Sequence, residues 1–176
     1  YRSVTEVLSG RDIVKRHPSL VPLSLEHHDA LVLAQGLILG RSKAPRSDWS
    51  TDHRSQIDRI KDFFQETFLA HFEAEEKHVF PRVAERIPDR TALVEELRKD
   101  HDDLRKLVRG LSAGCANELS VRLPSLGRLM EVHIRKEERV LFQAIQSDLE
   151  AVELEEVGAN IKAHLTGPRH CLLDDY

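Results

Sequence analysis

The segment HFEAEEKHVF at residues 71–80 recurs as HIRKEERVLF at residues 133–142. Both copies follow the pattern His-x-x-x-Glu-Glu-x-x-apolar-Phe. A histidine and a glutamate four residues apart lie on the same side of a helix, with Cβ atoms roughly 5–6 Å apart. Both side chains of such a pair can therefore reach one metal ion. Two such pairs, on helices that face each other, predict a two-metal site inside a helical bundle.

Each copy contains two adjacent glutamates, and helix geometry selects between them. At roughly 100° per residue, Glu75 lies about 40° from His71 around the helix, whereas Glu76 lies about 140° away. The same arithmetic selects the first glutamate of the second copy, and the other glutamate of each copy is expected to face solvent or to support a ligand. The ligands predicted from the two repeats are His71, Glu75, His133 and Glu137.

A shorter repeat predicts one further histidine on each of two other helices. The segment HDAL at residues 28–31 resembles HDDL at residues 101–104. His101 lies on an apolar helical stripe, so we expect it to point into the core. His27 and His28 are alternatives, because they lie about 100° apart around the helix and cannot both face one centre. The alignment with His101 favours His28, and His27 stays open as the alternative.

These side chains supply four imidazoles and two carboxylates, which is a donor set for two metal ions. A carboxylate on the core face of a helix is costly without a partner, and a cation removes that cost. Nitrogen donors with bridging carboxylates suit iron, with Mn or Zn as substitutes. An oxo, hydroxo or water ligand would complete the bridge. Positions left open on the metals would take a small ligand such as O2, peroxide or NO.

The spacing of apolar residues by three and four predicts an all-α fold, an up-down antiparallel four-helix bundle with a short extra C-terminal helix. Ser24 is the expected N-cap of the first helix, and Pro81 is expected to end or kink the second. Ser147 and Glu150 match a capping box before the last. The expected helices span about 24–39, 51–80, 90–112, 124–146 and 148–165. Whether residues 116–123 extend the fourth helix as a kinked turn stays open. The expected domain organisation is an irregular segment at 1–23, the bundle at 24–146, and a helix and tail at 147–176.

The composition excludes several other classes of protein. The 176 residues carry a net charge of −4, and their basic residues form no stripe that would indicate nucleic-acid binding. No apolar run approaches the ~20 residues that span a bilayer, and no signal peptide is visible. Cys115 and Cys171 form no CxxC motif. We therefore expect a cytoplasmic protein with no nucleic-acid or membrane partner.

Some of the remaining histidines and the single tryptophan admit simpler interpretations. His78 follows His71 by seven residues, so it is either a fifth imidazole near the site or a solvated histidine at the end of the bundle, which we favour. Trp49 is expected to pack a loop over one end of the bundle. The other histidines expected to be solvated are His17, His53, His164 and His170.

The order H…HxxxE…H…HxxxE resembles the hemerythrin-like, or HHE cation-binding, family over about residues 24–146. The resemblance implies a four-helix bundle with a non-haem di-iron centre and an oxygen-bridged metal pair. Oxygen-carrying hemerythrins have HxxxH on the third helix and HxxxxD on the fourth. Here Arg105 follows His101 by four, and Glu137 follows His133 by four. The pattern is therefore closer to relatives that repair iron–sulfur clusters, sense iron or oxygen, or process peroxide or NO.

Three functions are compatible with these patterns. The first is a di-iron protein that binds or reacts with O2, peroxide or NO; if it is an enzyme, it is an oxidoreductase of catalase-like or NO- or O2-processing type with a redox partner still to be found. The second is an iron- or oxygen-sensing module without turnover. The third is a structural bundle without metal, whose histidines belong to the core.

Overall fold

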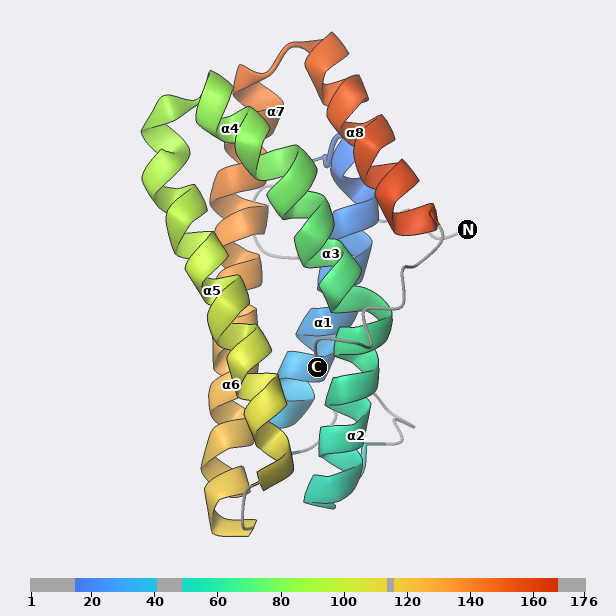
Figure 1. Cartoon of the computed structure of the whole chain (residues 1–176), viewed down its shortest axis with the longest axis vertical. Helices are drawn as coiled ribbons and strands as arrows, with labels where there is room; N and C mark the ends of the chain where they lie inside the picture. The colour runs from blue at the N-terminus through green and yellow to red at the C-terminus, as the bar shows by residue number, and fades with distance from the viewer. Residues whose placement is uncertain (1–14, 41–48, 114–115, 168–176) are drawn as a thin grey trace.

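The computed structural model describes residues 15–40, 49–113 and 116–167, and every regular element within these ranges is a helix. Four long rods lie alongside one another and alternate in direction (Figure 1). The prediction of an all-α helical bundle is confirmed. Both cysteines, His170 and most of the predicted loop at 41–50 lie outside the described residues.

Each rod is a helix or a chain of continuous helical segments. The first is α1 (Val21–Leu39), which follows the 3-10 turn η2 (Pro18–Leu20). The second consists of α2 (His53–Phe63), η3 (Phe64–Phe68), α3 (Leu69–Ala74), η4 (Glu75–Val79) and α4 (Phe80–Arg86). The third consists of η5 (Pro88–Arg90), α5 (Thr91–Arg109) and η6 (Gly110–Ala113). The fourth consists of α6 (Ala116–Lys136), η7 (Glu137–Leu141) and α7 (Phe142–Asp148). The extra helix α8 (Ala151–Thr166) packs against α3 and η4 at one end of the bundle (Figure 1).

The two repeated motifs each contain a π turn that begins at the predicted ligand glutamate. The backbone N–H of Phe80 donates to the carbonyl of Glu75, five residues earlier, and Phe142 donates in the same way to Glu137. A π turn is wider than an α turn and is often found at functional sites. The wide turn η4 also relieves the clash that Pro81 would make with the preceding turn. The second rod therefore continues past Pro81 to Arg86.

Three predicted helix starts are wrong. The fourth helix begins at Ala116 rather than at about 124, and Pro124 lies inside it. The first helix begins at Val21 rather than after Ser24, because Pro22 lies in the first turn, where its missing N–H leaves no bond unmade. The capping box of α8 is formed by Glu150 and Glu153 rather than by Ser147 and Glu150.

The apolar core falls into two clusters with a polar layer between them. On α5, Leu104 belongs to one cluster and Leu97 to the other, with His101 between the two. Within the π turn η7, which changes the register of the fourth rod, Leu141 is buried in the core and Val140 is 43% exposed. The buried polar layer lies at the same level on all four rods.

Candidate metal centre

The polar layer brings together one histidine from each rod and the first glutamate of each repeat. None of these six side chains is more than 1% exposed. They come from α1, α3, α5 and α6 and from the first residues of the π turns η4 and η7. The six residues are His27, His71, His101, His133, Glu75 and Glu137.

The six residues form two overlapping groups that could each hold a metal ion. One consists of His27 and His71 with both glutamates, and the other of His101 and His133 with the same glutamates. Within each group the ligand atoms lie within 4.8 Å of one another. We call these the His27 half and the His101 half. Because Glu75 and Glu137 belong to both, they are placed to bridge two ions.

The Nε2 atoms of the histidines all point at the shared carboxylates. In the His27 half, His27 Nε2 lies 3.1 Å from Glu137 Oε2, and His71 Nε2 lies 3.4 Å from Glu75 Oε2. In the His101 half, the Nε2 of His101 lies 3.4 Å from Glu75 Oε2. The fourth imidazole, that of His133, has its Nε2 atom 3.2 Å from Glu137 Oε2.

The preference for His28 over His27 is not supported by the structure. His28 is exposed, whereas His27 is buried and belongs to the candidate group. The alignment relied on an apolar stripe through Leu25 and Val32, but these residues are 46% and 50% exposed. Helix α1 is apolar on several sides, so hydrophobicity alone could not identify its inner face. The alternative that stayed open, His27, is the residue that the fold brings to the centre.

A carboxylate lies beside the outer ring nitrogen, Nδ1, of every candidate histidine. His27 Nδ1 donates to Glu138 Oε1 over 2.8 Å, and His71 Nδ1 donates to Glu26 Oε2 over 2.8 Å. His101 Nδ1 donates to Glu76 Oε1 over 2.7 Å. Such a bond holds the proton on Nδ1, which leaves Nε2 free to act as a ligand. The expectation that the second glutamate of each repeat supports a ligand agrees with these contacts.

The fourth histidine has a looser arrangement of the same kind. His133 Nδ1 faces Asp100 Oδ2 at 3.7 Å, which is too long for a direct hydrogen bond. Asp100 in turn accepts a hydrogen bond from Lys136 Nζ over 2.8 Å. Sequence reasoning did not identify Asp100 or Glu26 as supporting residues. Asp100 directly precedes His101 and Glu26 directly precedes His27, which was the only signal in the sequence. Each carboxylate, however, supports a histidine on another rod: Asp100 faces His133, and Glu26 accepts from His71.

The buried polar atoms of the centre fit a cation. Both carboxylate oxygens of Glu75 and of Glu137 are buried without a hydrogen-bond partner, as are His101 Nε2 and His133 Nε2. Leaving such atoms unpaired costs about 1–3 kcal/mol each, and more for charged groups. Imidazole nitrogen with carboxylate oxygen is a donor set that iron, zinc and manganese accept. The residues therefore fit a pair of metal ions.

Without a metal, protons carry the positive charge of the His27 half. Burial lowers the pKa of His71, but the charge of Glu75 and the hydrogen bond with Glu26 outweigh it and raise this pKa to about 10. Burial also lowers the pKa of His27, but the carboxylate of Glu137, 3.1 Å from Nε2, and the hydrogen bond with Glu138 outweigh it and raise this pKa to about 9. The two Nε2 atoms lie 2.9 Å apart, and both belong to the group of donors that could hold a metal ion.

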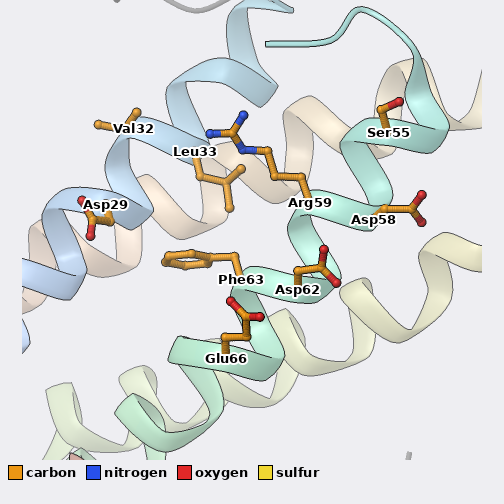
Figure 2. Close-up of a pocket in the computed structure, with 9 residues that line it drawn as sticks. All are labelled: Asp29, Val32, Leu33, Ser55, Asp58, Arg59, Asp62, Phe63 and Glu66. Carbon is orange, nitrogen blue, oxygen red and sulfur yellow. The ribbon is translucent and has the colours of Figure 1, made fainter. Parts of the chain in front are cut away.

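Other polar features lie away from the six residues. The His78 and His164 rings lie 5.5 Å apart, at the contact of η4 with α8, and neither residue belongs to the candidate groups. Trp49 packs against the core cluster beside Gly36, as expected for a residue that covers one end of the bundle. A surface hollow between α1 and the segment formed by α2 and η3 is lined mostly by acidic and apolar side chains, together with Ser55 and Arg59 (Figure 2). It contains none of the six candidate ligands.

Fold and site together define a helical bundle with a buried histidine–glutamate centre compatible with metal. The sequence profile of the Hemerythrin HHE cation binding domain matches residues 21–145. The chain therefore belongs to this family. It is also 28% identical, over 110 residues, to a protein of Nostoc sp. described as a DNA nickase; the match covers 60% of this chain but 31% of that protein. No solved structure matches significantly.

Within the family pattern, Arg105 stands where the oxygen carriers have a second histidine on the third helix. Its guanidinium donates to Glu76 Oε1 over 2.9 Å. Arg105 therefore holds the carboxylate that accepts the hydrogen bond from His101 Nδ1. Within the described ranges, no helix combines the length and apolar character needed to cross a membrane.

Proposed function

We propose that this chain is a non-haem di-iron protein whose metal pair binds or reacts with O2, peroxide or NO. The observation that carries the proposal is the sharing of Glu75 and Glu137 between two groups of buried donors. Each ion would receive two imidazoles and the bridging carboxylates. Such a set resembles the histidine and carboxylate ligands of non-haem iron sites that keep positions open for a small molecule.

Bound iron would supply a one-electron change between its ferrous and ferric states. The residues of the chain would hold the pair and exclude water. Phe72 stacks on His101 with ring centroids 3.9 Å apart, and Phe68 stacks on His71 at 5.3 Å. These aromatic walls support a dry centre that admits small, weakly polar molecules in preference to charged ones. No side chain of the site selects among O2, peroxide and NO.

The experiment compares the wild-type protein with a matched pair of variants. His71→Ala removes a buried candidate ligand, whereas His28→Ala removes an exposed histidine of α1. We expect near two irons per chain after anaerobic loading for the wild type and for His28→Ala, and a clear loss for His71→Ala. Peroxide and NO turnover should follow the iron content. Absence of bound iron in the wild type would contradict the proposal.

An iron or oxygen sensor without turnover is the second candidate. The observation that favours it is the contact of α8 with η4, the π turn that begins at Glu75. A change in metal occupancy at Glu75 could therefore alter the packing of a helix outside the four rods. Iron binding with a large rise in melting temperature, but without turnover, would support this function. A structural bundle without metal is disfavoured by the unpaired buried carboxylates.

The cytoplasmic location and the absence of a nucleic-acid partner stay predictions. The match covers only 31% of the Nostoc protein described as a DNA nickase, so that activity is not transferred to this chain. The acidic net charge of −4 supports a function that does not involve nucleic acid.

A further inference from the structure

The two halves of the centre share the same arrangement of aromatic and carboxylate contacts around one histidine each. In the His101 half, Phe80, the first residue of α4, stacks on His101 with ring centroids 5.5 Å apart. In the His27 half, the equivalent residue of the second repeat, Phe142, stacks on His27 at 5.6 Å. The supporting carboxylates also correspond, since Glu76 and Glu138 are the second glutamates of the repeats. The halves are thus related by an approximate two-fold symmetry.

In the His101 half, two arginines contact the stacked phenylalanine and the supporting carboxylate. The guanidinium of Arg98 lies 5.2 Å from the centroid of Phe80, and it donates to the carbonyl of Glu76 over 3.4 Å. Arg105 donates to the carboxylate of Glu76. Both arginines belong to α5, which also carries His101. Two residues of the bundle therefore fix both the aromatic wall and the supporting carboxylate of this imidazole.

In the His27 half, a single arginine from outside the four rods makes the corresponding contacts. Arg16 lies 5.1 Å from the centroid of Phe142 and donates to the carbonyl of Glu138 over 2.9 Å. It also pairs with the carboxylate of Glu138. Its other terminal nitrogen donates to Gln146 Oε1 over 3.0 Å. The Arg16 side chain is only 12% exposed, so these contacts are partly buried rather than fully exposed to solvent.

We propose that Arg16 is a positioning residue of the metal centre, which does for His27 what Arg98 and Arg105 together do for His101. It lies before residue 21, where the family match begins. The segment at 15–20 is then part of the centre. Because coupling between two sites is reciprocal, a segment that strengthens metal binding in the His27 half packs more stably against the bundle when a metal ion is bound there. This inference rests on the proposed metal function.

The test is a titration with Co2+, whose visible absorption reports its ligands, on the full chain. Removing a group that orients a ligand typically costs 10- to 100-fold in metal affinity. We expect Arg16→Gln to weaken one of two Co2+ sites about tenfold or more and to leave the other unchanged. Arg105→Gln should weaken one site as well. The double variant should weaken both, because the two arginines serve different halves. Arg135→Gln, which breaks a pair with Glu131 on α6, is the control.

Three outcomes would overturn the inference. The first is an Arg16→Gln titration identical to that of the wild type. The second is a double variant that keeps one tight site, since both arginines would then act on the same half. The third is a lower melting temperature of the metal-free Arg16→Gln protein with unchanged Co2+ affinity, which indicates a structural role alone. Failure of the wild type to bind Co2+ would instead refute the proposed metal function on which the inference rests.

Discussion

Glu137→Gln is the substitution that most sharply tests the shared carboxylates. Glu137 is fully buried, belongs to both candidate groups and lies on the core side of η7. Glutamine keeps its shape but replaces a charged ligand with a neutral amide. One substitution should therefore weaken both metal positions, whereas loss of any one histidine affects one half.

The expected magnitude follows from mass action. At a free metal concentration of about 100 times Kd, each filled site stabilises the native state by about 2.7 kcal/mol, and two sites by about 5 kcal/mol. For a chain of this size, that corresponds to a rise in melting temperature of about 10–20 °C. We expect this rise for the wild type and a rise of only a few degrees for Glu137→Gln.

The assay is thermal unfolding with and without Zn2+, which avoids redox chemistry. Glu131→Gln on the same rod is the control, since its pair with Arg135 is partly exposed and such pairs contribute about 0–1 kcal/mol. Equal metal-induced rises in the wild type and Glu137→Gln would refute the bridging role of this carboxylate.

Three further outcomes are expected. His27→Ala should lower metal binding by one ion per chain, whereas His28→Ala should leave it unchanged, as measured by metal analysis after dialysis. The pKa values of His27 and His71 are raised from 6.5 to about 9 and about 10, so the stability that their protons add to the metal-free fold is complete below about pH 6.5 and is lost as the pH rises through 9 and 10. Metal affinity should tighten as the pH rises over the same window, because metal and protons compete for these nitrogens. Chelator competition between pH 6.5 and 8.5 measures this change. Gly127→Val should destabilise the fold by about 1–3 kcal/mol in urea unfolding, because a Cβ there would lie 2.7 Å from the carbonyl of Ala34 and force α1 away from α6.

The sequence predicted five of the six central residues directly, because periodicity and chelate spacing are local properties of a helix. His71 and Glu75, like His133 and Glu137, lie four apart on one rod, so one turn of geometry places them together. His101 was identified from its apolar stripe. The choice on α1 failed because burial there depends on how the rods pack, and α1 is apolar on more than one side.

The supporting contacts could not be predicted from local pattern. Glu138 supports His27 from 111 positions away, and Arg16 reaches Glu138 from 122 positions away. The π turns were also missed, since no spacing rule for an α-helix includes the additional residue. They explain why Val140 faces outward and why Pro81 does not end its rod.

Diffraction from crystals of the iron-loaded protein, recorded on both sides of the iron absorption edge, tests the central claim most directly. The arrangement of donors predicts two anomalous peaks, about 3.5–4 Å apart as in other two-metal sites, with Glu75 and Glu137 between them. A single peak within the bundle, or iron bound only at the surface histidines, would contradict a carboxylate-bridged pair.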